Sequence, residues 1–459
     1  MKKLYILLLL FVVAFTSHSK STEIDSAYIY KTYAAIGKKI IEKAMSDSSA
    51  WERLAYFCDS FGPRFSGSEN LNNSLIWAEQ EMKKDGLENV KLEEVLVPNW
   101  KRGEEYCKMI FPRNKEIKIS SLGRSIGTLE KGIEAPVLVV KSFDDLAQKG
   151  DLAKGKIVVY NIPWLNYGQA VQYRWAGASI AAKYGAVASL VRSVSPIGFD
   201  MVHTGVMNYE DTLPKIPHAA ITLEDVLLLQ RIQDRGITPV LRLKMSCKTE
   251  PDTISYNLMG ELIGKGKPNE IVAIGGHSDS WDYGEGAHDD ASGIISTWQA
   301  VKLLKELNLH PQRTIREVFW VNEENGTRGG TAYANKHKDE KHFLVFEFDS
   351  GVFEPLAIGF NGDDKYYEIL KGITPIIQEI APDFTVRKGG GGVDIGPMMK
   401  LGVSGMSLST KGKDEYFWYH HSASDTPDKV DPMLLNKCIA VIAITIYIYA
   451  DLPDFISTK

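Results

Sequence analysis

The chain has 459 residues, of which 44% are hydrophobic and 24% are charged, so it is long enough for two domains or for one elaborated domain with a sizeable core. Its formal net charge is −5 and the sequence has no strong basic patch, which argues against nucleic acid and anionic membranes as partners. Composition alone predicts a globular protein.

The first 19 residues have the layout of a secretory signal peptide. Two lysines precede an apolar run over residues 4–15, and small and polar residues follow. The run is too short to span a bilayer comfortably. We expect cleavage near Lys20, which predicts a secreted or periplasmic protein with no membrane partner after cleavage. An uncleaved anchor is the alternative.

Two segments with different sequence patterns follow the expected signal peptide. Residues 24–91 show helical periodicity, in segments such as "SAWERLAYFCDSF". Beyond residue 135, short β-rich runs such as "GKIVVYNI" and "VLRLKMS" alternate with helical pieces such as "WAGASIAAKYG". This change predicts a separate α/β module over residues 131–252, flanked by a domain made from residues 20–130 and 253–459.

From residue 253 onward, apolar strands alternate with amphipathic helices. "EIVAIGGHSDS" precedes "ASGIISTWQAVKLLKEL", and "TIREVFWVNEENG" precedes "GGTAYANKHKD". Such alternation predicts a parallel or mixed sheet covered by helices on both faces. The late apolar run "CIAVIAITIYIYA" is short for a membrane span, so we expect it to form a final core helix.

Polar residues collect where each of these predicted strands ends. His277 and Asp279 follow the first strand, Glu323 and Glu324 the second, and Asp349 the third. Ligands of open α/β sheets bind outside the carboxyl ends of the strands, so we expect these side chains to converge on one crevice. Each residue taken singly could be a buried histidine or a solvated carboxylate, but one metal site accounts for all of them.

The stretch "GEGAHDDASG" places two adjacent aspartates, Asp289 and Asp290, between glycines. Adjacent carboxylates repel each other and cost desolvation when buried, so a site that keeps them usually holds a cation. A polar surface turn is the alternative. Near the C-terminus, "WYHHSASDTPD" adds His420, His421 and Asp425. This set of nitrogen and oxygen donors suits zinc or a similar divalent ion.

The spacing of these residues also suggests their roles. With one residue between them, Asp279 can accept a hydrogen bond from the far ring nitrogen of His277 and fix its tautomer. Asp289 can offer one oxygen to each of two ions, while Asp290 supports the turn. One of the two adjacent glutamates can bind metal while the other holds the proton of an activated water.

The four cysteines are widely separated and form no thiolate cage for a metal. Disulfides remain possible in an exported protein.

Four ordered motifs, "HSDSWDYGEGAHDDASG", "NEENGTRGG", "FEFDSG" and "YHHSASDTPD", closely resemble those of the co-catalytic zinc exopeptidases of peptidase family M28. The resemblance covers nearly the whole mature chain, and the intervening module resembles a protease-associated domain. It implies a mixed, mostly parallel sheet flanked by helices, with an inserted protease-associated α/β domain. It also implies a homodimer.

The resemblance implies two Zn²⁺ ions per subunit and a general base, Glu323, that moves the proton of a bridging water to the leaving amine. Some relatives have an oxyanion-holding tyrosine where this chain has His420, so either His420 or the zinc pair takes that role. Asp394, in the loop "GGGGVDIGPM", binds a substrate amine or is a plain loop carboxylate. The implied metal ligands are His277, Asp289, Glu324, Asp349 and His421.

We therefore expect an exopeptidase that cleaves small peptides, in particular dipeptides with both ends free. Arg328 and Arg387 are candidates for binding a substrate carboxylate. The alternatives are an aminopeptidase that acts on longer peptides, a glutaminyl-cyclase-like acyl transferase with one zinc, and a non-catalytic receptor-like protein.

Overall fold

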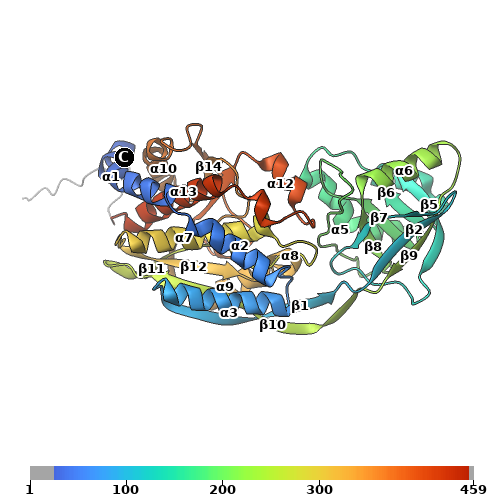
Figure 1. The fold of residues 1–459 in the computed structure, drawn as a ribbon, viewed down its shortest axis with the longest axis horizontal. Coiled ribbons are helices and arrows are strands. Elements are labelled where there is room, and N and C mark those ends of the chain that lie inside the picture. Colours follow the sequence, from blue (N-terminus) through green and yellow to red (C-terminus); the bar gives the residue numbers. More distant parts are fainter. Residues whose placement is uncertain (1–24, 454–459) are drawn as a thin grey trace, which may run out of the picture.

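The computed structural model describes residues 25–453, which form two lobes (Figure 1). Each lobe is built on its own eight-stranded sheet. The expected signal peptide, residues 1–19, lies outside the described residues.

The sheet of the larger lobe is mixed, as expected. Strands pair in parallel at its centre, where β11 lies between β12 and β13, and antiparallel pairs flank them. In sheet order the strands are β1 (Glu88–Lys101), β10 (Lys248–Leu262), β12 (Arg313–Trp320), β11 (Lys267–His277), β13 (Lys341–Glu347), β16 (Gly405–Thr410), β14 (Pro355–Asn361) and β15 (Thr385–Lys388).

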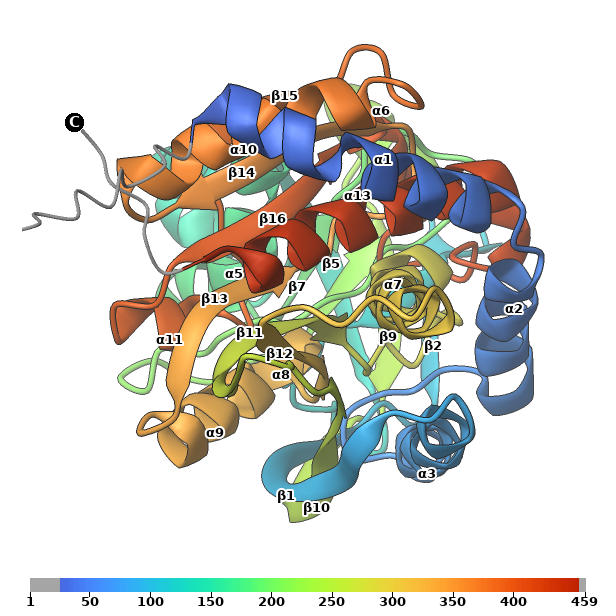
Figure 2. The same ribbon diagram turned by 90° about the vertical axis from the view of Figure 1, so that its left-hand side faces the viewer.

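Helices cover both faces of this sheet (Figure 2). On one face the main core packs against α1 (Ser26–Met45), α2 (Ser49–Phe61), α3 (Glu69–Lys84), α7 (Ser292–Glu306), α10 (Asp364–Ile377) and α13 (Pro432–Asp451). A smaller core under α9 (Arg328–His337) and α11 (Gly396–Lys400) covers the other face. The apolar run that predicted a final core helix lies in α13, and 83% of the helix's most apolar window is buried inside the protein. The prediction of a core helix is confirmed.

The smaller lobe is a domain inserted between β1 and β10. Its helix α6 (Leu223–Asp234) packs on one face of the second sheet, and α4 (Phe143–Lys149) and α5 (Tyr167–Lys183) pack on the other. In sheet order its strands are β3 (Lys115–Glu116), β2 (Glu105–Phe111), β9 (Val240–Met245), β5 (Ile133–Val140), β6 (Ile157–Tyr160), β7 (Ala188–Arg192), β8 (His218–Ile221) and β4 (Ile119–Ser121).

The inserted domain begins earlier than residue 131, the boundary expected from the change to short β-rich runs in the sequence. Strands β2, β3 and β4 precede that position, yet all three belong to the second sheet. Strands β3 and β4 are short, and β2 and β3 carry charged residues, so all three lack the apolar runs that marked the later strands.

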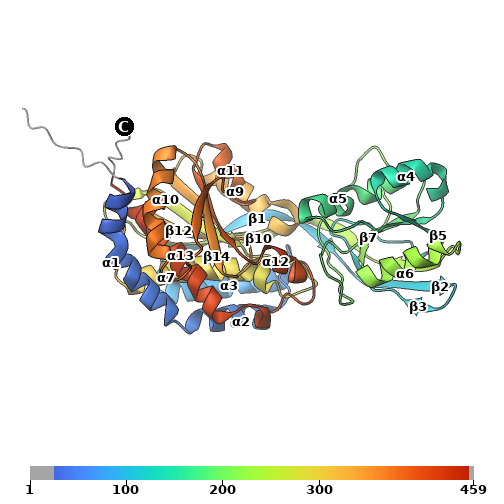
Figure 3. The same cartoon turned by 90° about the horizontal axis from the view of Figure 1, so that it is seen from above.

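A two-stranded arm connects the lobes (Figures 1 and 3). Strands β1 and β10 pair antiparallel along their length, and the pairing ends at Lys101 and Lys248, where the chain enters and leaves the inserted domain. The pair of strands β1 and β10 thus carries the inserted domain at one end and belongs to the larger sheet.

Candidate metal centre

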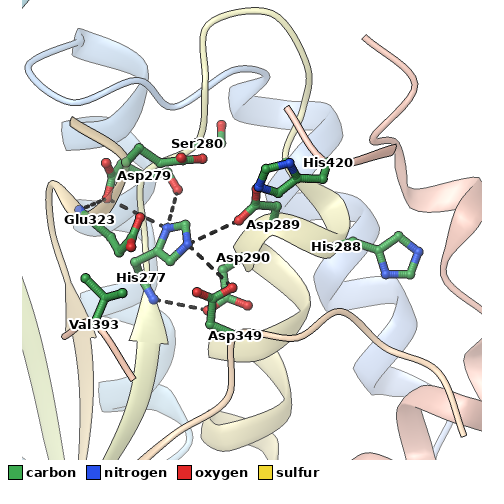
Figure 4. Close-up of polar contacts among 12 residues, drawn as sticks. His277, Asp279, Ser280, His288, Asp289, Asp290, Glu323, Asp349, Val393 and His420 are labelled. Carbon is green, nitrogen blue, oxygen red and sulfur yellow. Dashed lines mark hydrogen bonds and ion pairs between the residues drawn. The ribbon is translucent and has the colours of Figure 1, made fainter. Parts of the chain in front are cut away.

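The polar residues that follow the predicted strands lie close together in the structure. His277 is the last residue of β11, Glu323 begins the short helix α8 (Glu323–Gly326) after β12, and Asp349 follows β13. In Figure 4 the His277 ring lies at the centre of the group, with Asp279, Asp289 and Asp349 around it. The expected convergence therefore occurs because β11, β12 and β13 are parallel neighbours that end at one edge of the sheet.

Asp289 connects two groups of potential metal ligands. On one side, Nε2 of His277 is 3.3 Å from Oδ1 of Asp289 and 3.9 Å from Oδ1 of Asp349. On the other side, Nε2 of His421 is 3.3 Å from Oδ2 of Asp289 and 2.9 Å from Oε2 of Glu324. Each oxygen of Asp289 thus faces a different group, which is the arrangement that a bridging carboxylate needs.

The chemistry of this cluster fits divalent cations. Oε1 of Glu324 and Oδ1 of Asp349 are buried and accept no hydrogen bond from the described residues. Burial of an unpaired carboxylate oxygen is costly unless a cation lies beside it. Imidazole nitrogens combined with carboxylate oxygens suit zinc and similar ions.

The electrostatics of His277 reflect the surrounding acids. Burial disfavours its charged form, but the hydrogen bond to Asp289 and the charges of Asp349 and Glu323 outweigh burial, and the pKa of His277 is raised well above its ordinary value. An imidazole that attracts a proton this strongly lies in a site built for positive charge.

The role of Asp279 differs from the expected one. Nδ1 of His277 lies 2.9 Å from the backbone oxygen of Asp279, whereas the nearer carboxylate oxygen is 3.9 Å away. The His277 ring is therefore oriented by a carbonyl group and not by the carboxylate. The carboxylate instead accepts a hydrogen bond of 3.1 Å from the backbone N–H of Glu323, so Asp279 positions two functional residues.

Asp290 and Asp425 support the backbone that carries Asp289. Oδ2 of Asp290 accepts a hydrogen bond from the backbone N–H of His277 at 3.1 Å, which ties the turn to the end of β11. Asp425, which the sequence suggested as a donor to metal, accepts backbone hydrogen bonds from His288 at 2.7 Å and from Asp289 at 3.1 Å. The His288 ring points away from the cluster (Figure 4).

Glu323 and Glu324 occupy different environments although they are adjacent. Glu324 contacts His421, whereas Glu323 lies at the wall of the pocket beside His277. Burial, opposed by the charge of His277 and reinforced by the charges of Asp349 and Glu324, raises the pKa of Glu323 well above its ordinary value. A carboxyl group with a raised pKa exchanges protons closer to neutral pH than an ordinary carboxyl group does.

The cluster opens into a pocket of about 520 Å³ between the two lobes. Asp289, Glu323, Glu324, Asp349, His420 and His421 contribute to one wall. The inserted domain supplies the facing residues, which are Arg124, Tyr167, Arg174, Trp175 and Val206. This size is within the usual range of small-ligand sites.

Comparison with known proteins assigns the family. The sequence profile of peptidase family M28 matches residues 257–446. Carboxypeptidase Q of Xenopus laevis is 42% identical over 440 residues, which cover 95% of this chain and 92% of that protein. The chain belongs to peptidase family M28. As the four sequence motifs predicted, it is a metallopeptidase similar to carboxypeptidase Q.

Solved structures support the fold of this M28 peptidase. A peptidase M28 precursor from Shewanella amazonensis SB2B superposes with a TM-score of 0.88 at 31% identity, covering 92% of this chain and 98% of that one. A zinc aminopeptidase from Bacillus subtilis shares the fold, with a TM-score of 0.63 at 19% identity and coverage of 89% and 98%.

The inserted domain of the M28 peptidase contacts the candidate metal centre directly. The backbone oxygen of Thr204 lies 3.2 Å from Nδ1 of His421, and the backbone N–H of Thr204 donates to the His421 oxygen at 2.9 Å. Nδ1 of His203 lies 2.7 Å from the backbone oxygen of His420. The orientation of a candidate ligand thus depends on a second domain, which no local sequence pattern signals.

Two further residues lie near the acidic cluster. The ring of His420 stacks on that of His421 at 3.5 Å, with Nε2 3.6 Å from Oδ2 of Asp289, and burial together with the charge of His421 lowers the pKa of His420 well below its ordinary value. Tyr416 also lines the pocket, and burial and the charge of Asp289 raise the pKa of its phenol. Tyr416 was missed, although it lies one helical turn before His420.

Asp394 lies behind the pocket wall, where its neighbour Val393 faces the pocket. Asp394 is only 1% exposed, and neither of its carboxylate oxygens accepts a hydrogen bond from the described residues. Burial, followed by the charges of Glu347 and Glu323, raises the pKa of Asp394 well above its ordinary value. This position gives a substrate amine no access to Asp394 in the present structure.

The two arginines suggested for a substrate carboxylate lie outside the pocket. Arg328 forms an ion pair of 2.6 Å with Asp252, and Arg387 hydrogen-bonds Ser409 at 2.5 Å. Neither lines the pocket.

Proposed function

We propose that this M28 peptidase is a secreted exopeptidase that holds two zinc ions and hydrolyses small peptides, in particular dipeptides with both ends free. The observation that carries the proposal is the position of Asp289 between two donor groups at the floor of a pocket. The layout of residues 1–19 supports secretion. The zinc named for the structurally similar Bacillus subtilis aminopeptidase supports the choice of metal.

His277, Asp289 and Asp349 would hold one ion, and Asp289, Glu324 and His421 the other. When bound, such ions polarise the scissile carbonyl group and lower the pKa of the attacking water. Glu323, which lines the pocket beside His277, would accept the proton of that water and deliver it to the amine of the departing product.

The remaining residues prepare this chemistry. Asp279 fixes the backbone of Glu323 and the ring of His277. Tyr416 and His420 both lie where they can donate a hydrogen bond to a developing oxyanion, and we propose that one of them does so. We further propose that the inserted domain is of the protease-associated type. We also propose that the subunits form a homodimer, and sedimentation of the purified protein would test this oligomeric state.

A second candidate function is an aminopeptidase that acts on longer peptides, because the Bacillus subtilis protein of the same fold is named as one. The acyl-transferase alternative, with one zinc, is disfavoured by the two donor groups around Asp289. A receptor-like protein without activity is disfavoured by the presence of every expected ligand.

The proposal is tested by hydrolysis of a panel of free dipeptides beside their N-acetylated and C-amidated forms, using protein whose bound metal has been counted. We expect about two zinc ions per chain, much faster cleavage of free dipeptides than of their blocked forms, and loss of activity with a chelator. Equal cleavage of the amidated forms would favour the aminopeptidase. Failure to cleave any dipeptide with two ions bound would refute the proposed substrate class.

A further inference from the structure

A cationic side chain in the pocket is a strong partner for the free carboxyl end of a substrate. In the described part of the chain, only two cationic side chains other than histidine line the pocket, Arg124 and Arg174, and both come from the inserted domain. The two arginines differ in the groups that they already bind, and this difference indicates which of them is available for a substrate carboxylate.

Arg174 already takes part in the contact between the two lobes. Arg174 is 3% exposed, and its guanidinium group lies 3.3 Å from the Thr204 oxygen, 3.3 Å from Nδ1 of His421 and 2.9 Å from the Tyr167 hydroxyl. We assign it to holding Thr204 and His421 in place.

Arg124 reaches from the inserted domain to the segment that carries a metal ligand. Its Nε and Nη2 atoms donate to the side-chain oxygen and the backbone oxygen of Asn325 at 3.2 Å and 2.7 Å. Asn325 directly follows Glu324. The backbone of Arg124 is held in the left-handed region at φ 74° by a loop in which Gly123 bonds Gly205 and Met207.

Arg124 lacks the carboxylate partner that some other arginines of the chain have, and unlike the buried Arg174 it is only partly buried. Arg102 pairs with Asp282 at 2.6 Å and Arg316 with Glu261 at 2.7 Å. Within residues 25–453, no carboxylate lies at ion-pair distance from Arg124, and its Nη1 atom has no hydrogen-bond acceptor. Burial, and next the charge of Arg328, lower the pKa of Arg124, so an incoming carboxylate would relieve an unfavourable environment.

The size of a dipeptide requires the anchor to be close to the metal centre. Successive Cα atoms are about 3.8 Å apart, so the terminal carboxylate of a dipeptide lies only a few ångströms from the scissile carbonyl. An arginine that binds it must therefore line the same pocket as Glu324 and Asp349. Arg124 does, whereas Arg328 and Arg387 do not.

We propose that Arg124 binds the terminal carboxylate of the substrate and thereby restricts this peptidase to dipeptides with a free carboxyl end. The proposal rests on the proposed exopeptidase function and identifies the residue that sets its selectivity. The planar guanidinium group of arginine suits a carboxylate because it can donate two parallel hydrogen bonds. In a longer peptide the same carboxylate would lie too far from the reacting bond.

The test compares the wild type with Arg124→Met and Arg124→Lys on the best-cleaved free dipeptide and on its C-amidated form. Arg328→Met is the matched control, since Arg328 is a neighbouring arginine that lies outside the pocket and already has an acidic partner. Metal content and thermal unfolding are measured for every variant, so that a misfolded or metal-depleted protein is recognised.

We expect Arg124→Met to lower kcat/KM for the free dipeptide about a hundredfold, to leave the slow cleavage of the amidated form unchanged and to retain its metal. Arg124→Lys should recover part of the loss, and Arg328→Met should match the wild type. An equal loss on both substrates, or no loss on either, would overturn the role of Arg124. A metal-loaded wild type that cleaves neither substrate would instead refute the proposed function, and the inference with it.

Discussion

Asp279 illustrates how much of this site depends on single residues outside the candidate ligand set. Its backbone oxygen orients His277, and its carboxylate holds the backbone of Glu323. The proposed metal ligand His277 and the proposed general base Glu323 are therefore fixed relative to each other by one residue. We therefore expect substitutions of the adjacent residues Glu323 and Glu324 to have different effects.

Replacement of Glu323 by glutamine should abolish proton transfer and leave the metal centre intact. Because general acid–base groups contribute roughly 10²–10⁴-fold to rates, we expect kcat to fall by that amount with no change in zinc content. The adjacent Glu324→Gln variant is the contrast, since it removes a ligand and should lose both metal and activity. Kinetics together with metal analysis would check both, and a fully active Glu323→Gln protein would remove this residue from the mechanism.

Replacement of Asp289 by alanine should remove metal from both donor groups, because each oxygen of this carboxylate faces a different group. We expect fewer than one zinc ion per chain after dialysis, measured by elemental analysis. Asp383→Ala removes an exposed carboxylate that pairs with Lys411 and should retain all metal. Full occupancy in the Asp289 variant would contradict the bridge.

The residues that could be predicted from sequence share one property. His277, Glu323 and Asp349 each follow an apolar strand, and the rule that parallel strands end at one edge brings them together. Thr204 and Arg124 could not be predicted, because they meet His421 and Asn325 only through the packing of one lobe against the other. Neither residue belongs to a motif that marks its role.

At the scale of elements, the glycine-rich loop before α11 is shaped by a buried carboxylate. Glu347, the last residue of β13, accepts hydrogen bonds of 2.9 Å from the backbone N–H groups of Val393, Asp394 and Ile395. Burial, and next the charge of Asp349, raise the pKa of Glu347 to about 7. This glutamate thus holds the segment that brings Val393 to the pocket wall.

A methyl group at Gly392 should disturb this loop. A Cβ atom there would lie 2.0 Å from the Glu347 carboxylate, whereas a Cβ at Gly396 would have no neighbour within 4 Å. We expect Gly392→Ala to lower the melting temperature by several degrees and to raise KM, and Gly396→Ala to leave both nearly unchanged. Thermal unfolding and steady-state kinetics would decide, and equal effects of the two substitutions would contradict the proposed packing.

The elements that sequence periodicity identified are those with long apolar runs, such as β11, β12 and α13. Strand β1 was not identified, because its burial alternates irregularly and its first half carries several charges. The early strands of the inserted domain were not identified because they are short or carry charged residues. Tertiary pairing, and not intrinsic preference, makes these segments strands.

At the scale of the whole molecule, the inserted domain has its own cores and its own buried titratable groups. His218 is 0% exposed, with Nδ1 2.7 Å from the Ser189 hydroxyl and Nε2 3.3 Å from the Tyr173 oxygen. Burial lowers the pKa of His218 to about 4. The folded domain therefore requires a neutral imidazole at this position.

This requirement predicts loss of stability in acid. Because the folded pKa is below the unfolded value, the unfolded chain binds the extra proton first, and stability falls as pH drops from about 6.5 towards 4. The shift to a pKa of about 4 corresponds to roughly 3 kcal/mol at the acidic end. Denaturant unfolding at several pH values should show a smaller acid-induced loss for His218→Gln than for the wild type. An identical pH dependence would refute this assignment.

The pocket has one wall in each lobe, and this division has an evolutionary consequence. Substitutions in the inserted domain can change the wall formed by Arg124, Tyr167 and Trp175 and leave unchanged the core of the larger lobe, which positions the proposed metal ligands. Descendants of one ancestral enzyme could therefore diverge in the peptides they accept while inheriting the same chemistry. Thr204, His203 and Arg174 are less free to change, because they contact His420 or His421 of the larger lobe.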